Sequence, residues 1–137
     1  MTDSCARSVC VFVGAAVLHA LSASAILPPA QTGNFYVSDF NNDRIVAYDA
    51  SGSHLGSFTA PGLDGPRGIV VLPDGRIHVA SQLTDEVFVF TADEVFDAKF
   101  GHPQLNGPTG MAIHDDDLLY VASFDNDQVV VFKLDGT

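Results

Sequence analysis

The sequence predicts an all-β fold built from repeated antiparallel sheets, and two observations support this prediction. First, the segment 36–48 recurs at 78–90 and again at 120–132, without a gap and at a constant period of about 42 residues. Second, short runs rich in Val, Ile, Phe and Tyr alternate with turns rich in Gly, Pro, Asn and Asp, and helical periodicity is absent after position 25. A period near 40 with short strands in each repeat is typical of β-propeller blades. The predicted fold class is therefore an incomplete β-propeller of four-stranded antiparallel blades.

Residues 1–25 have the layout of a secretory signal peptide. Arg7 precedes an apolar run over 9–21, and Ala23, Ser24 and Ala25 supply small residues for a cleavage site. The run is shorter than the roughly 20 apolar residues of an ordinary membrane span, so an anchor is the less favoured interpretation. The sequence thus predicts export, to the periplasm, the cell envelope or the medium.

Residues 26–33 read as an extended linker, because Pro28 and Pro29 exclude a regular helix or a central strand. Both cysteines, Cys5 and Cys10, lie in the signal segment, so the mature chain has none. Without disulfides, packing must supply the stability of an exported protein.

Residues 34–137 form the propeller segment, with blades at about 34–58, 67–100 and 109–137. The strands that we expect are 34–38, 44–48, 54–58, 67–72, 76–80, 86–91, 95–100, 109–114, 118–122 and 128–133. The four strands of a complete blade are called a, b, c and d in chain order. In these terms the ten strands read b-c-d, a-b-c-d and a-b-c, which is two and a half blades, whereas closed propellers have about four to eight. Our hypothesis is that the chain is the N-terminal part of a longer propeller; self-association is the other possible source of the remaining blades. The apolar runs 87–90 and 129–132 predict strands covered on both faces.

The repeat resembles the NHL family over about residues 34–137. Pro66 to Ile69 and Pro108 to Met111 match its Pro-x-Gly-Ile/Met opening. The first copy matches the rest best, with Asp39, Asn42, Arg44 and Ile45 in register. The second copy departs, with Ser81, Thr84, Glu86 and Val87 at those positions, and the third keeps only Asn126. This resemblance implies a propeller architecture but no particular activity, because propellers host many functions.

The net charge of −11 argues against nucleic acid as a partner, because a phosphate backbone would be repelled. The basic residues of the propeller segment are scattered and form no patch: Arg44, Arg67, Arg76, Lys99 and Lys133.

A meander blade places its d-to-a loops and its b-to-c turns on one side, and we expect the ligand-binding face there. The loops are 59–66 and 101–108, and the turns are 39–43, 81–85 and 124–127. The candidate ligand-binding residues are Arg67, Thr109, Asp39, Asn41, Ser81, Gln82, Ser123 and His102. The competing interpretation of each single residue is ordinary turn chemistry. Asp39 and Arg44 are also placed to form a structural ion pair across their turn.

No metal site or cofactor is predicted. Asp43, Asp85 and Asp127 recur in every copy, which indicates turn capping, since successive blades would hold them too far apart for a shared ion. Asp115, Asp116 and Asp117 offer the carboxylate oxygens that Ca²⁺ prefers, but they occupy an a-to-b turn, and a solvated turn is the favoured interpretation.

The sequence offers no recognisable catalytic set. His78 shares its repeat position with Tyr36 and Tyr120, which favours packing over catalysis. His102 is the best candidate for acid–base work, yet spacing identifies no partner for it. The favoured function is a secreted scaffold that binds a ligand or a protein. The alternatives are part of a six-bladed enzyme, similar to lactonases, streptogramin lyases or amidating lyases, and a structural blade array for surface or matrix assembly.

Overall fold

The computed structural model describes residues 33–114 and 117–137. Ten strands and two 3₁₀ turns follow one another along this part of the chain. They are β1 (Phe35–Asp39), η1 (Phe40–Asn42), β2 (Arg44–Tyr48), β3 (His54–Phe58), β4 (Pro66–Val71), β5 (Ile77–Ser81), β6 (Glu86–Phe90), β7 (Phe96–Gly101), β8 (Pro108–His114), β9 (Leu118–Ser123), η2 (Phe124–Asn126) and β10 (Gln128–Lys133). Each predicted strand is present, and its bounds lie within one residue of the prediction. The predicted signal peptide, the predicted linker up to residue 32 and the candidate Ca²⁺ ligands Asp115 and Asp116 lie outside the described residues.

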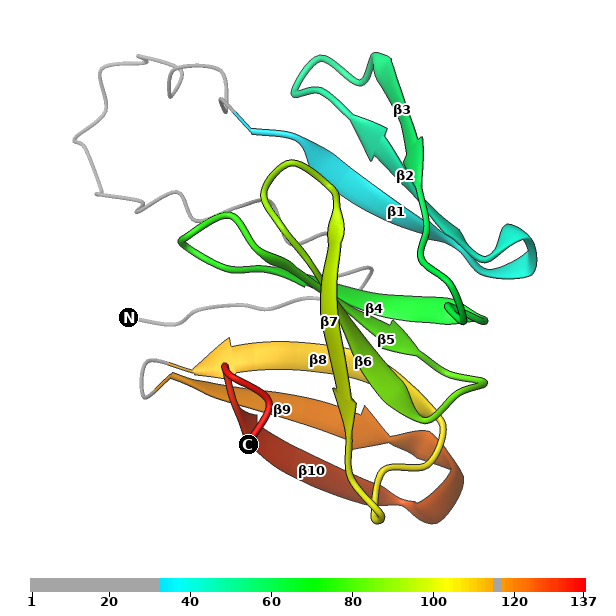
Figure 1. Ribbon diagram of the computed structural model, residues 1–137, viewed down its shortest axis with the longest axis vertical. Helices are drawn as coiled ribbons and strands as arrows, with labels where there is room; N and C mark the ends of the chain where they lie inside the picture. Colours follow the sequence, from blue (N-terminus) through cyan, green and yellow to red (C-terminus); the bar gives the residue numbers. More distant parts are fainter. Residues whose placement is uncertain (1–32, 115–116) are drawn as a thin grey trace, which may run out of the picture.

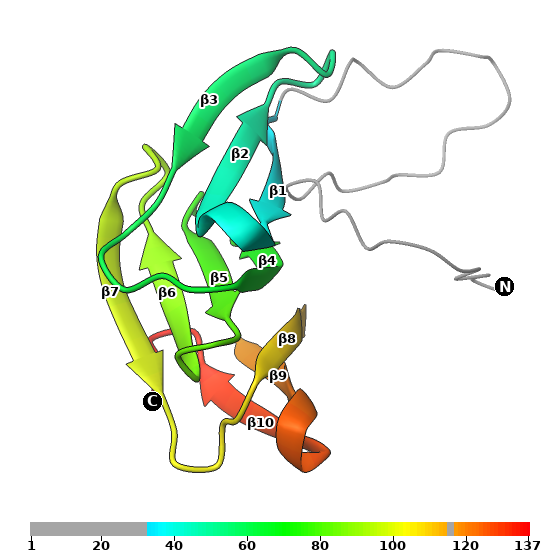
Figure 2. The ribbon, with the colours of Figure 1, turned by 90° about the vertical axis from the view of Figure 1, so that its right-hand side faces the viewer.

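The strands form three separate antiparallel sheets, which we call blades 1, 2 and 3 (Figure 1). Blade 1 has the order β1-β2-β3, blade 2 has β4-β5-β6-β7, and blade 3 has β10-β9-β8. Every strand therefore pairs with its sequence neighbour, as a meander requires. Seen from the side, the sheets follow one another along an arc, with β1, β4 and β8 on the inner side and β3 and β7 on the outer side (Figure 2). The predicted pattern of two and a half blades is confirmed for the described residues.

Two apolar cores lie between the blades. Between blades 1 and 2 the buried residues are Ile45, Ala60, Leu63, Ile77, Val79, Phe88 and Phe90. Between blades 2 and 3 they are Val70, Leu72, Ala80, Val87, Leu105, Met111, Leu119, Val121, Val130 and Phe132. Because each core draws on two sheets, no blade could bury its apolar faces alone, and stacking of the sheets provides the hydrophobic stabilisation.

The two apolar runs that were expected to be covered on both faces behave differently. In β6, Val87, Phe88 and Phe90 are 0% exposed, which confirms the prediction for blade 2. In β10, Val129 is 63% and Val131 46% exposed, so the prediction is wrong for blade 3. The reason is positional: blade 2 lies between two sheets, whereas among the described residues only one sheet packs against blade 3.

The same reason separates Val37 from its repeat equivalents. Val79 and Val121 are fully buried, whereas Val37 is 45% exposed on β1. In blades 2 and 3 an a strand pairs with the strand that carries the valine, as Ile69 does with Val79 and Met111 with Val121. The described part of blade 1 has no such strand, so the repeat fixes the register of Val37 but not its surroundings.

Candidate functional site

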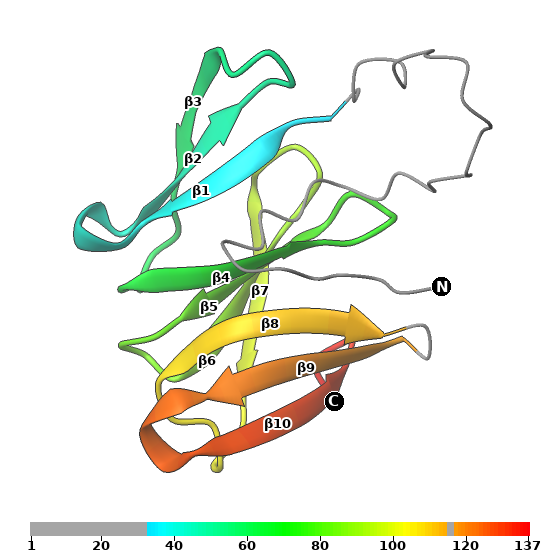
Figure 3. The ribbon, with the colours of Figure 1, turned by 180° about the vertical axis from the view of Figure 1, so that it is seen from behind.

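The loops and turns of the predicted binding face lie together at one edge of the stacked sheets, where the loops hydrogen-bond to the turns beside them (Figure 3). The amide of Gln82 donates to the carbonyl of Gly65 at 3.1 Å, and the amide of Phe124 donates to the carbonyl of Gly107 at 3.1 Å. Each d-to-a loop is therefore fastened to the b-to-c turn of the blade that it enters. We call this edge, formed by residues 59–66, 101–108, 39–43, 81–85 and 124–127, the loop edge.

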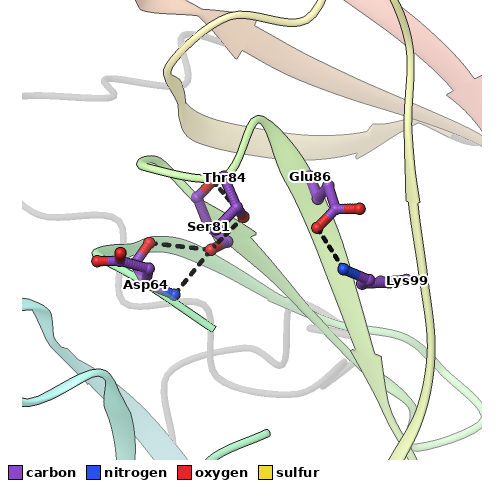
Figure 4. Close-up of polar contacts among 5 residues, drawn as sticks. All are labelled: Asp64, Ser81, Thr84, Glu86 and Lys99. Carbon is purple, nitrogen blue, oxygen red and sulfur yellow. Dashed lines mark hydrogen bonds and ion pairs between the residues drawn. The ribbon is translucent and has the colours of Figure 1, made fainter. Parts of the chain in front are cut away.

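Two of the predicted ligand contacts, Ser81 and Ser123, are buried and hold the loops in place. The Ser81 hydroxyl accepts from the amide of Asp64 at 3.0 Å and donates to the carbonyl of Asp64 at 2.9 Å, while the Thr84 hydroxyl lies 2.7 Å away (Figure 4). Ser123 makes the same pair of bonds to Asn106, at 2.7 and 3.1 Å. With exposures of 0% and 1%, these side chains support the loop edge from inside, and their hydroxyls are not available to a ligand there.

Arg67 and Gln82, by contrast, form an accessible cluster with Phe40. Arg67 is exposed at the start of β4, and its guanidinium carbon lies 4.4 Å from the centroid of the Phe40 ring. Its Nε donates to Oε1 of Gln82 at 2.7 Å. Phe40 comes from blade 1 and the other two residues from blade 2, so the cluster spans the junction between the blades. The sequence indicated Arg67 and Gln82 but not Phe40; the only signal was that Phe40 and Gln82 share a repeat position.

Among the described residues, no carboxylate pairs with the guanidinium of Arg67. The other two arginines in this part of the chain are paired, Arg44 with Asp39 at 2.8 Å and Arg76 with Asp74 at 2.8 Å. Arg67 has a ring and an amide as neighbours instead, which orient the guanidinium while leaving its charge available. Planar guanidinium groups held in this way suit bidentate recognition of carboxylates and phosphates.

The remaining predicted ligand-binding residues differ in how much of each side chain is exposed to solvent and free of bonds within the chain. The Asp39 carboxylate is bonded within its own turn, because Asn42 donates to Oδ1 at 2.8 Å and Arg44 donates to Oδ2. These two bonds lower the pKa of the Asp39 carboxyl. The predicted ion pair between Asp39 and Arg44 is therefore confirmed. Asn41 is exposed beside it. Thr109 is half-buried on β8. His102 is exposed in the loop before β8, where its Nδ1 accepts from the amide of Gln104 at 3.2 Å.

The recurring aspartates do more than cap turns, and the sequence prediction missed this. Oδ1 of Asp43 accepts from the amide of Gly65 at 2.9 Å, and Oδ1 of Asp85 accepts from the amide of Gly107 at 2.7 Å. Each bond links the turn of one blade to the loop that begins the next. The available signal was the sequence separation from aspartate to glycine, which is the same in both pairs.

His78 has the packing role that its repeat position predicts. It is fully buried on blade 2, with its ring 5.9 Å from that of Phe100 in an edge arrangement. Neither ring nitrogen has a hydrogen-bond partner among the described residues. Burial, with a smaller contribution from the positive charge of Arg76, lowers the pKa of His78 to about 4. A neutral imidazole without access to solvent cannot serve as an acid or base for a ligand on the loop edge.

Within residues 33–114 and 117–137, no group of three or more His, Cys, Asp or Glu side chains could hold a metal ion. An open cleft of about 510 Å³ lies at the opposite edge, where the a-to-b turns are, and is lined by Leu72, Pro73, Asp74, Arg76, Asp117, Lys133, Leu134 and Asp135. Its charges are of both signs and Arg76 is paired with Asp74, so we keep the loop edge as the candidate site. The described part of the chain contains no helix that is long and apolar enough to cross a membrane.

Neither a family model nor a curated protein matches the sequence, but the structure is similar to solved structures of β-propeller proteins. A structure of streptogramin B lyase matches with a TM-score of 0.68 at 19% identity, over 82% of this chain and 40% of that one. Hydrazine synthase from Kuenenia stuttgartiensis matches with a TM-score of 0.66 at 18% identity, over 76% and 30%. A catalytically inactive histidine-to-alanine variant of virginiamycin B lyase from Staphylococcus aureus, with quinupristin, matches with a TM-score of 0.60 at 17% identity, over 76% and 39%.

These similarities establish the fold class: the described chain is an all-β propeller segment of antiparallel blades. Because no identity exceeds 19%, they show the fold alone and transfer no activity. The chain spans two fifths or less of the length of each of these structures.

Proposed function

We propose that the chain is a secreted, NHL-type propeller segment that acts as a binding scaffold, and that its loop edge binds an anionic group of a small molecule or a protein through Arg67. The observation on which the proposal rests is the oriented guanidinium of Arg67, 4.4 Å from the Phe40 ring and 2.7 Å from Gln82 Oε1, with no carboxylate paired to it in the described chain. In a protein of net charge −11, such an arginine is an exception that recognition of an anion would explain.

The neighbours of Arg67 indicate which anion fits best. The Phe40 ring fixes one face of the guanidinium, and Gln82 occupies Nε, so the two terminal nitrogens remain to grip a pair of oxygens. Leu83, which borders the Gly65 turn together with the Phe40 ring, is 61% exposed and offers apolar surface at the same junction. A carboxylate attached to an apolar or aromatic group would match both features, and Asn41 and Thr109 are the further contacts that we expect from the earlier candidates.

The test is a titration of the labelled protein with benzoate, acetate and inorganic phosphate at constant ionic strength, followed by the arginine Nε–H resonances in NMR spectra. We expect a saturable shift at Arg67, with benzoate binding tightest. Arg67→Gln should weaken binding about tenfold or more, the effect of losing a charged hydrogen bond. Arg76→Gln, which removes an ion-paired arginine at the opposite edge, is the matched control and should bind normally. Linear shifts without saturation, or equal binding by wild type and Arg67→Gln, would overturn the proposal.

An enzyme is the second candidate, favoured by the similarity to two lyases. The histidine on the loop edge is His102, since His78 is buried. We would incubate the protein, with and without Ca²⁺, with a streptogramin B antibiotic and a panel of lactones, and detect products by mass spectrometry. Turnover that disappears in His102→Ala would favour the enzyme, whereas no turnover leaves the binding scaffold as the better interpretation.

Export has its own test, because the N-terminal segment lies outside the described residues. When the chain is produced in a host that recognises secretory signals, the mass of the exported protein should correspond to a mature chain that starts at Ile26. Retention of the full chain in the cytoplasm would contradict the secreted location without affecting the binding proposal.

A further inference from the structure

The cleft at the a-to-b turns lies outside the loop edge and takes no part in the binding of anions at Arg67. It forms where the β4–β5 turn, the start of β9 and the residues after β10 come together, opposite the loop edge (Figure 1). Residues 72–74 and Arg76 line it from blade 2, and Asp117 and residues 133–135 line it from blade 3. Its volume of about 510 Å³ falls within the roughly 300 to 1,000 Å³ of pockets that take small molecules. We call it the turn cleft.

Part of the turn cleft is apolar and held in place by the backbone. Leu72, directly after β4, is 3% exposed, and Pro73 beside it is exposed. The amide of Leu72 donates to the carbonyl of Arg76 at 2.8 Å, which closes the turn of blade 2. Leu134, half-buried directly after β10, donates its amide to the carbonyl of Asp117 at 3.2 Å. The cleft therefore offers a preformed apolar surface to the hydrocarbon part of a ligand.

Two of the three carboxylates that line the turn cleft are bonded within the chain. Asp74 accepts from the amide of Arg76 at 3.0 Å and from its Nε at 2.8 Å. Oδ1 of Asp135 accepts from the hydroxyl of Thr137 at 2.7 Å and from its amide at 2.9 Å. Asp117 is exposed, and no group of the described residues donates to its carboxylate. Asp117 is thus the carboxylate that can accept from a ligand.

The two cations of the turn cleft keep hydrogen-bond donors that the described chain does not use. Lys133 is exposed, and the ion pairs among the described residues involve Arg44, Arg76 and Lys99 but not Lys133. Arg76 donates to Asp74 through Nε, so its two terminal nitrogens remain. A carboxylate in the cleft would therefore find both an ammonium and a guanidinium group.

We propose that the turn cleft binds a zwitterion with an apolar body, the chemistry shared by free apolar amino acids and short apolar peptides. The ligand's carboxylate accepts from Lys133 and Arg76, and its ammonium group donates to Asp117. Its hydrocarbon part packs against Leu72 and Leu134. The cleft contributes the few charged groups and the apolar surface that are typical of small-molecule sites.

A ligand with charge of one sign matches the turn cleft less well. Its three carboxylates would repel a simple anion, and its two cations would repel a simple cation. A zwitterion meets the opposite charge at each of its ends. The loop edge differs, because no carboxylate of the described residues pairs with Arg67 there, and the two edges should select different ligands. The binding of zwitterions therefore does not depend on the binding of anions at Arg67.

The test is a titration of the labelled protein with leucine and with leucyl-leucine at pH 7 and constant ionic strength. The methyl resonances of Leu72 and Leu134 report on the cleft in NMR spectra. The matched analogues are 4-methylpentanoate, which is leucine without its ammonium group, and 3-methylbutylamine, which is leucine without its carboxylate. We expect saturable shifts with the zwitterions and binding at least about tenfold weaker with each analogue, the effect of losing a charged hydrogen bond. The tighter of the two zwitterions identifies a free amino acid or a peptide as the source.

Two substitutions remove one charge each from the turn cleft. Lys133→Met keeps the length of the side chain, and Asp117→Asn suits the left-handed backbone, where φ is 60°. Each should weaken leucine binding about tenfold. Lys133→Met should also reduce the advantage of leucine over 3-methylbutylamine, and Asp117→Asn its advantage over 4-methylpentanoate. The matched controls are Lys99→Met, on the outer strand β7, and Asp127→Asn, at the loop edge with φ of 56°, and both should bind leucine normally.

Three results would overturn the proposal. They are shifts that do not saturate, single-charge analogues that bind as tightly as the zwitterions, and normal leucine binding by both cleft variants. Circular dichroism and thermal unfolding of the four variants establish that each is folded, so that weaker binding reports on the lost charge.

Discussion

Blade 2 and blade 3 have nearly the same pattern of residues but different surroundings, and the difference identifies what a blade contributes by itself. Val87 and Val89 are buried between two sheets, whereas their equivalents Val129 and Val131 are largely exposed. Asp85 accepts a hydrogen bond from the next blade, whereas Asp127, with the same backbone conformation, does not within the described chain. A blade thus supplies strands and register on its own, but it depends on its neighbours for burial and for the bond at its turn. Substitutions at equivalent positions of the two blades measure this dependence.

The largest difference should come from the inner strands. Gly68→Ala places a methyl group 2.2 Å from the carbonyl of Thr109 and should reduce the free energy of unfolding by about 3 kcal/mol, at the upper end of the usual cost of overpacking. Gly110→Ala enters open space and should change it by less than about 0.5 kcal/mol. Urea unfolding followed by circular dichroism compares the two. Equal costs would mean that β4 and β8 are not in close contact.

The buried histidine should make stability depend on pH. The pKa of His78 is about 4 in the folded chain against about 6.5 unfolded, so the unfolded state binds the extra proton between these values. The contribution of His78 to the free energy of unfolding is fully present above about pH 7. It is lost as the pH falls from about 6.5 to 4, and the loss amounts to up to about 3 kcal/mol. His78→Tyr introduces the residue found at the equivalent positions 36 and 120 and should remove this dependence.

The measurement is the unfolding free energy at several pH values between 4 and 7.5 for wild type and His78→Tyr. A profile that stays flat in wild type would show that His78 is accessible to solvent.

The bond between turn and loop should have an intermediate effect. Asp85→Ala leaves the buried amide of Gly107 without an acceptor and should cost about 2 kcal/mol more than Asp127→Ala. Both residues have positive φ, 58° and 56°, so the strain of an alanine there cancels in the comparison. Thermal unfolding of the two variants gives the difference, and its absence would mean that the bond adds no stability.

The smallest difference should come from the apolar strands. Val87→Ala removes two buried methyl groups and should cost about 1.5 to 2 kcal/mol, whereas Val129→Ala, at a 63% exposed position, should cost less than about 0.5 kcal/mol. Chemical denaturation compares these two variants. Similar costs would indicate that Val129 is covered in solution, for instance by self-association.

The sequence was sufficient to predict the strands, because their signals are local. Alternation of apolar runs with Gly, Pro and Asn/Asp turns defines ten strands to within one residue, and the constant period of the repeat defines their grouping. It also placed the loops and turns on one edge, which follows from antiparallel topology alone.

What the sequence could not provide depends on contacts between blades. Nothing local separates Val129 from Val87, or Val37 from Val79, because only the neighbouring sheet decides their burial. Ser81 and Ser123 looked like accessible polar residues, yet their hydroxyls satisfy the backbone of the loops beneath the surface. The sequence did not predict Phe40 as part of the candidate site, because its contact with Arg67 joins residues of two different blades.

The near contact between Gly68 and the carbonyl of Thr109 has a geometric consequence for any ring built from these repeats. The inner strands form the hub, and their separation, together with the width of the side chains farther out, determines the wedge angle between adjacent sheets. A residue larger than glycine at the hub would push the inner strands apart, reduce the wedge angle and enlarge the circumference. A glycine at this position, as at 68 and 110, therefore helps to set how many blades complete a full turn.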